Sequence, residues 1–116
     1  MLLIKNISIF LLLSVNIYAN NMGLTLFQGN CVTCHYPNKS ISAPSMRLVQ
    51  KRYKEAFETK ADFIDYMSKW VVNPDEQTSL MSDMIEKYEL MPQLAFSIET
   101  TKDIADYIYK EDFSKY

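Results

Sequence analysis

Apolar and aromatic residues recur at helical spacing from Val49 to Ile108. Residues three or four positions apart lie on the same face of a helix, so such a stripe predicts a helix that buries this face. The four stripes are Val49, Arg52, Tyr53, Ala56 and Phe57; Phe63, Ile64, Met67, Trp70 and Val71; Leu80, Met81, Met84, Ile85 and Tyr88; and Ile104, Ala105, Tyr107 and Ile108. No segment alternates convincingly at period two, and the sequence therefore predicts an all-α fold.

Local signals place some ends of these helices. Thr59 is a suitable N-cap, with Asp62 three residues later, and predicts that the second helix begins there. Asn73-Pro74 predicts its end, because a residue before proline is disfavoured in helical geometry. The final helix is expected to begin near Thr100 or Thr101.

The first residues have the order of a secretory signal. Lys5 precedes an apolar run that ends before Ala19, a small residue suited to cleavage. We expect cleavage after Ala19, a mature N-terminus at Asn20 and export to the periplasm. The apolar run is shorter than the roughly 20 residues of a membrane-spanning helix, although a retained anchor stays an alternative.

Composition and charge narrow the possible functions. The chain has 116 residues, 48% of them hydrophobic, which predicts one globular domain over residues 20–116. Loss of residues 1–19, whose single charged residue is Lys5, changes the formal charge from -2 to -3. A mildly acidic protein has no electrostatic reason to bind nucleic acid.

Residues 31–35 read Cys-Val-Thr-Cys-His, which is the attachment pattern of c-type haem. Each thiol adds to one vinyl group of the porphyrin, and two intervening residues let one helical turn reach both groups. The histidine that follows supplies a nitrogen ligand to the iron. The pattern predicts one haem c attached through Cys31 and Cys34, with His35 as the proximal ligand.

Three other uses of the two cysteines are less well supported. A thioredoxin-like pair needs a βαβ setting, and no alternating β pattern precedes Cys31. A zinc site needs a fourth ligand, but the chain has no other Cys or His. A disulfide across two residues would be strained and would leave the adjacent His35 unexplained.

Three segments around the haem motif add to the pattern. Together with the motif, they make the chain resemble a class I c-type cytochrome over residues 22–113. Gly23 and Phe27 precede the motif, and the resemblance implies that they pack across the C-terminal helix near Tyr107. Pro44 follows it, in Ser-Ala-Pro where the family more often has glycine before the proline. The resemblance implies that the Pro44 carbonyl accepts a hydrogen bond from the proximal imidazole. It also implies a small helical fold wrapped around the haem.

Met91, in Leu-Met-Pro before the last helix, matches the second axial ligand of this family. Proline restricts Met91 to an extended backbone, which suits a rigid ligand-bearing loop. Core packing accounts for Met67, Met81 and Met84, although the last two stay alternative ligands. Met22 and Met46 are expected to lie too near the attachment segment or the proximal proline. Core or haem-edge packing is likewise expected of Tyr53, Trp70 and Tyr88.

The resemblance implies a one-electron carrier between respiratory redox partners, a donor and an acceptor that we expect to be membrane-bound complexes. Iron held on both sides by protein ligands has no open position for a substrate, so we expect neither catalysis nor a stable small-molecule substrate. The alternatives are a cytochrome subunit of a larger oxidoreductase and, if the sixth position is open, a small peroxidase or gas-binding protein.

Overall fold

The computed structural model describes residues 22–116, and the predicted signal over residues 1–19 lies outside them. Within the described residues the chain is helical and has no strand, which confirms the predicted all-α class. The elements are α2 (Met22–Asn30), α3 (Met46–Ala56), α4 (Lys60–Val72), η1 (Glu76–Thr78), α5 (Ser82–Tyr88), α6 (Ile98–Lys110) and η2 (Phe113–Lys115).

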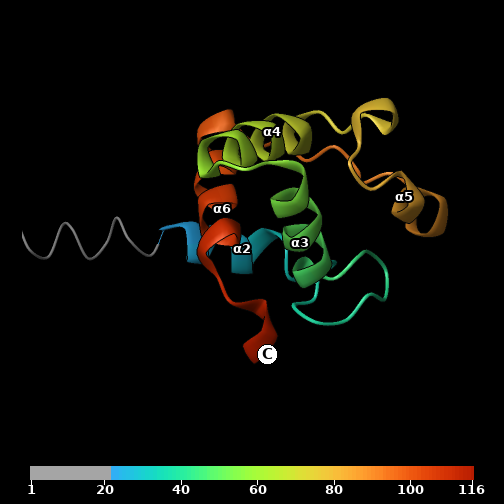
Figure 1. Ribbon diagram of the computed structural model, residues 1–116, viewed down its shortest axis with the longest axis horizontal. Helices are drawn as coiled ribbons and strands as arrows, with labels where there is room; N and C mark the ends of the chain where they lie inside the picture. Colours follow the sequence, from blue (N-terminus) through green and yellow to red (C-terminus); the bar gives the residue numbers. More distant parts are fainter. Residues whose placement is uncertain (1–21) are drawn as a thin grey trace, which may run out of the picture.

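Helix α6 organises the fold, because both α2 and α4 pack against it. In Figure 1 α4 crosses one end of α6, α2 crosses behind it, and α3 descends beside them. The apolar faces of these helices meet in one core. Its buried residues are Phe27, Met46, Tyr53, Phe63, Met67, Ile104, Ala105, Ile108 and Phe113. Helix α5 lies apart from this core, packs chiefly against η1 and contains no buried residue.

The predicted close crossing of α2 and α6 is present. A Cβ atom on Gly23 would lie 2.6 Å from the carbonyl oxygen of Asp103 and 2.9 Å from Cβ of Tyr107. Only glycine fits this backbone approach without a shift. One turn later, the Phe27 ring packs against the Tyr107 ring with 5.1 Å between centroids. The contact predicted between Gly23, Phe27 and Tyr107 is therefore confirmed.

The predicted ends of α4 are confirmed. The Thr59 hydroxyl accepts a hydrogen bond from the Asp62 amide at 3.2 Å, and Asn73 is the C-cap before Pro74. Helix α6 begins at Ile98, earlier than the predicted Thr100 or Thr101, because the Ser97 hydroxyl caps it by accepting from the Thr100 amide.

Helix α5 begins later than its stripe predicted. Its first residue is Ser82, so Leu80 and Met81 lie before the helix. Met81 is the N-cap residue and has no helical backbone, since its own amide donates to the Ser79 hydroxyl at 3.0 Å. The Met81 carbonyl then accepts the first helical hydrogen bonds, from the amides of Met84 and Ile85.

The C-terminal segment closes the core beside α2. Phe113 is 1% exposed and packs against Phe27 with 5.8 Å between ring centroids. Glu111 holds this segment, because its carboxylate accepts hydrogen bonds from the Lys115 ammonium and the Tyr107 hydroxyl. These two interactions, that with Lys115 being the larger, lower the pKa of Glu111 to about 2. The segment therefore keeps its charged anchor at neutral pH.

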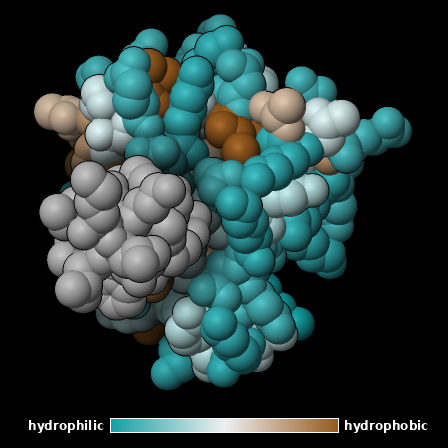
Figure 2. All heavy atoms as spheres, turned by 90° about the vertical axis from the view of Figure 1, so that its left-hand side faces the viewer, coloured by the Kyte–Doolittle hydropathy of each residue, from teal (hydrophilic) through white to brown (hydrophobic). Residues whose placement is uncertain are grey.

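Polar residues cover the outside of the helices. The face shown in Figure 2 is mostly hydrophilic, with small separate hydrophobic spots, outside the part that grey atoms cover. This is the expected result of amphipathic helices that turn their apolar stripes inward. Among residues 22–116, no helix has the length and apolar character needed to cross a membrane.

Replacing Gly23 with Ala is expected to lower the free energy of unfolding by about 1–3 kcal/mol, the usual cost of overpacking. The new methyl group would clash with the α6 backbone at Asp103, which cannot rotate away. Denaturant unfolding of the haem-loaded protein measures the change. Gly29→Ala is the matched control in the same helix, since nothing lies within 4 Å of its Cβ position. It should be neutral or stabilise by up to about 1 kcal/mol. Equal stability of both variants would contradict the close-crossing argument.

Candidate haem-binding site

The cysteine motif forms a tight turn directly after α2. The amide of Cys31 donates to the Phe27 carbonyl at 2.9 Å, and the amide of His35 donates to the Cys31 carbonyl at 2.9 Å. These bonds continue helical geometry through the motif, so Cys31, Cys34 and His35 follow one another around a single turn. Since Phe27 is buried in the core, the turn is fixed to the rest of the protein.

The two cysteines lie in different surroundings. Cys31 is half-buried and Cys34 is exposed, and no disulfide joins them. Burial, followed by the charge of Cys34, raises the pKa of Cys31 to about 11. A raised pKa keeps the buried Cys31 thiol protonated at neutral pH. Within residues 22–116, no group of three or more Cys, His, Asp or Glu side chains is arranged as a metal site.

His35 has the orientation that iron ligation requires. Its Nδ1 lies 2.7 Å from the carbonyl oxygen of Pro44. A carbonyl only accepts hydrogen bonds, so Nδ1 carries the proton and Nε2 keeps its lone pair for a metal. Burial lowers the pKa of His35 although the bond to Pro44 opposes this, and the lowered pKa favours the neutral ring. The structure thus contains the bond that the resemblance implied, and Ala43 before Pro44 does not disturb it.

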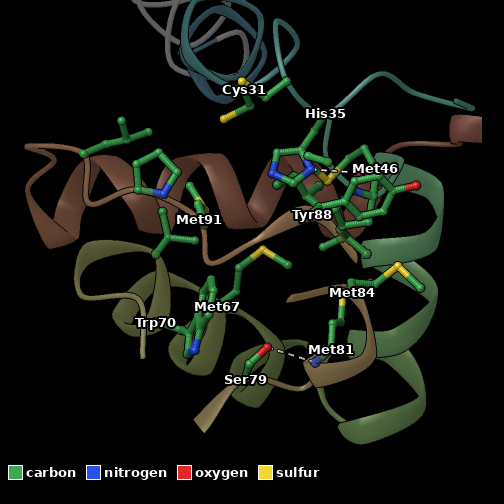
Figure 3. A pocket seen from close by; sticks show the side chains of 18 of the residues that line it. Cys31, His35, Met46, Met67, Trp70, Ser79, Met81, Met84, Tyr88 and Met91 are labelled. Carbon is green, nitrogen blue, oxygen red and sulfur yellow. Dashed lines mark hydrogen bonds between the residues drawn. The ribbon is translucent and has the colours of Figure 1, made fainter. Parts of the chain in front are cut away.

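A cavity of about 300 Å³ lies beside this histidine. Residues from all the α-helices of the described chain and from the loops around Pro44 and Met91 line it, and most of the lining is apolar. Figure 3 shows Cys31 and His35 at one side of the cavity and Trp70, Ser79 and Met81 at the other. An apolar cavity with two thiols and an imidazole at one wall fits a covalently attached haem.

Five methionines line the cavity: Met46, Met67, Met81, Met84 and Met91. Met46 lies on the His35 side in Figure 3 and Met67 is 3% exposed in the core. Met81 is buried outside the main core cluster, and Met84 is half-buried. Met67 belongs to the core cluster, whereas Met81 and Met84 lie outside it, and all three line the cavity.

Met91 comes from a different kind of segment. It lies in the stretch without regular structure between α5 and α6, is half-buried and lines the cavity together with Leu90 and Pro92. The structure thus brings Cys31, Cys34, His35 and Met91 around one cavity.

Two of the aromatic residues that line the cavity use their polar atoms within the protein. Trp70 donates from Nε1 to the Asp75 carbonyl at 3.1 Å, and the Tyr88 hydroxyl donates to the Ser40 carbonyl at 3.4 Å. Tyr53 is 5% exposed, and burial raises the pKa of its hydroxyl. These surroundings agree with the packing role predicted for Tyr53, Trp70 and Tyr88.

Sequence reasoning missed how the proximal loop is fixed. The amides of Met46 and Arg47, at the start of α3, donate to the carbonyls of Tyr36 and Pro37 at 2.8 and 3.0 Å. Ser45 caps the same helix through its hydroxyl. Ser45 before an apolar stripe was a usable N-cap signal, whereas the backbone pairing leaves no trace in side-chain identity.

Comparison with known protein families finds a match. The family model described as Cytochrome c matches residues 21–110. No curated protein and no solved structure matches the chain.

Changing either Cys31 or Cys34 to Ser is expected to leave one thioether bond and to lower the yield of mature protein, since each thiol attaches one side of the porphyrin. Mass spectrometry after acid-acetone extraction measures the attachment. The native chain should retain one haem, and a haem that extracts cleanly from it would contradict covalent binding. His35→Ala should keep both thioether bonds but lose the proximal ligand.

Proposed function

Because the chain belongs to the cytochrome c family, we propose that it is a periplasmic monohaem carrier that passes single electrons between respiratory partners. Membership establishes haem-based electron transfer with redox partners and a haem c attached through Cys31 and Cys34. The periplasmic location, the respiratory role and the sixth ligand are the proposed parts.

The observation that carries the proposal is the hydrogen bond between His35 Nδ1 and the Pro44 carbonyl. It fixes the tautomer and the ring orientation, and a histidine ligand whose outer nitrogen donates to a carbonyl is a stronger base toward iron. The Pro44 loop is fixed in turn by the start of α3. Hydrogen bonds within the protein therefore hold His35 and the Pro44 loop in place.

The bound haem supplies an iron that changes between two oxidation states by one electron. The protein supplies the surroundings that make this change fast and selective. Apolar side chains around the cavity, among them Val49, Leu80 and Ile104, exclude water from its interior. Low polarity limits the rearrangement that accompanies a change of charge and tunes the potential.

We assign the sixth ligand position to Met91. Met46 is on the proximal side and Met67 is held in the core, as described above, so neither is favoured for the opposite axial position. Met81 is the N-cap residue before α5, and Met84 lies within the helix. Met91 lies outside regular structure and directly before Pro92, which disfavours helical backbone at Met91, and a methionine ligand raises the reduction potential of the iron.

A carrier of this kind needs two partners, since it must accept an electron from one protein and yield it to another. We propose a donor and an acceptor among membrane-bound respiratory complexes. A haem with both axial positions occupied by protein has no open site for oxygen or peroxide, and this disfavours an enzymatic role.

Met91→Ala is expected to abolish the weak long-wavelength sulfur-to-iron band of the oxidised protein, lower the potential and allow the reduced protein to bind carbon monoxide. The physical reason is the loss of the thioether ligand. Visible spectroscopy and redox titration measure these changes.

Met22→Ala serves as the control, because Met22 is 49% exposed and lies outside the cavity lining. If Met91→Ala keeps the sulfur-to-iron band while Met81→Ala or Met84→Ala loses it, the assignment to Met91 is wrong. Rapid carbon monoxide binding by the unmutated protein would instead favour the peroxidase or gas-binding alternatives.

Export is tested on the protein made in its natural host or in a haem-attaching bacterium. Cleavage after Ala19 should give a mature chain that begins at Asn20 and is released with the periplasmic fraction. N-terminal sequencing and mass spectrometry read the cleavage site. A chain that keeps Met1 and stays with the membranes would support the retained anchor.

A further inference from the structure

An ion pair at the protein surface joins α3 to α5. Nη1 of Arg52 donates to Oδ1 of Asp83 at 3.0 Å, and Nη2 donates to Oδ2 at 2.7 Å. The arrangement is bidentate, which is the strongest and most directional form of an arginine–carboxylate pair. Hydrogen bonding from Arg52 lowers the pKa of Asp83, so this carboxylate stays ionised at neutral pH.

The two ends of this pair belong to different sides of the site. Arg52 is on α3, whose first residues are bonded to Tyr36 and Pro37 directly after His35. Asp83 is in the first turn of α5, and only Glu89 and Leu90 separate α5 from Met91. The pair therefore connects the element that fixes the proximal ligand with the element next to the proposed distal ligand.

Helix α5 has few other attachments. It has seven residues, no buried residue and no side-chain hydrogen bond at its N-cap. A helix of this length is unstable unless the rest of the protein holds it. It packs chiefly against η1, and its Tyr88 hydroxyl donates a hydrogen bond to the Ser40 carbonyl, which is long at 3.4 Å.

The segment after α5 also requires support. Glu89 has φ 70° and ψ 170°, a backbone conformation that favours glycine. Among the described residues it is the one non-glycine residue with a positive φ. Such a conformation persists only where the surroundings impose it. The imposed turn at Glu89 directs the chain from the end of α5 into the segment that carries Met91.

We propose that Arg52 and Asp83 are positioning residues that hold α5 against α3 and thereby keep Met91 at the haem. The inference rests on the proposed function, in which Met91 is the sixth ligand. When the pair opens, α5 and the Glu89 turn relax, and Met91 leaves the iron more often. The pair thus governs how readily an external ligand replaces methionine.

The test uses the oxidised, haem-loaded protein and imidazole, which binds iron only after the sixth ligand leaves. Arg52→Gln removes the pair but leaves Asp83 in the first turn of α5, where a carboxylate favours the helix. Imidazole should bind about three- to fivefold faster than to the unmutated protein at low salt, as expected for one exposed ion pair. The difference should shrink at high salt, where exposed charges are screened.

Arg52→Lys is the conservative variant and should bind imidazole at an intermediate rate, because lysine keeps the charge but not the bidentate geometry. Lys69→Gln is the matched control. It removes an exposed pair with Asp65 at 3.0 Å, which lies within α4 and joins no two elements. This control should bind imidazole at the native rate.

A second measurement does not depend on which residue ligates the iron. Hydrogen exchange at the amides of Ile85 and Glu89, which close the two ends of α5, should accelerate in Arg52→Gln relative to amides of α4. Unchanged exchange at these amides would overturn the inference. If the native protein already binds imidazole as fast as Met91→Ala does, the assignment of Met91 as the sixth ligand fails. Hydrogen exchange at the α5 amides then decides by itself whether the pair holds α5.

Discussion

The close crossing of α2 and α6 is the constraint on which the site depends. Gly23 lets the two backbones approach, and Phe27 then packs between Tyr107 and Phe113. Because α2 runs directly into Cys31, this contact fixes where the haem-attachment turn begins. A larger residue at Gly23 would move the cysteines and the histidine as one unit. Haem attachment at the motif therefore depends on the contact between α2 and α6 at Gly23.

The two sides of the cavity are built with different rigidity. On the proximal side, His35 is bonded to Pro44, and the loop between them is bonded to the first turn of α3. On the other side, α5 packs against η1 and is otherwise held by an exposed ion pair and one long hydrogen bond, and the Met91 segment is tied to α4 by a long hydrogen bond from Gln93 to the Val72 carbonyl. Local stability follows the density of buried contacts, so opening is expected on the α5 side first. We expect the His35 side to hold the haem in place while α5 and the Met91 segment open and close.

Much of this arrangement could be predicted from the sequence because its signals are local. Hydrophobic stripes gave α3, α4 and α6, and Thr59 and Pro74 gave the ends of α4. The spacing of Cys31, Cys34 and His35 indicated the cofactor. Helix α5 was placed less well, since Leu80 and Met81 continue its stripe but face the cavity from non-helical backbone. A stripe records which residues are buried and does not distinguish burial against a helix from burial against a cofactor.

The interactions that the sequence did not reveal are those between distant segments. Arg52 belongs to a stripe that predicts a helix face, yet its guanidinium pairs with Asp83, 31 residues away. No spacing rule connects two such positions, and charged residues are common on both helices. The consequence is specific to the site, because the helix that this pair holds ends in the strained turn at Glu89 that leads to Met91. Surface pairs of this type usually add little stability. Here a small energy acts on a short helix with no buried residue, so it can change how often α5 opens without changing whether the whole protein folds.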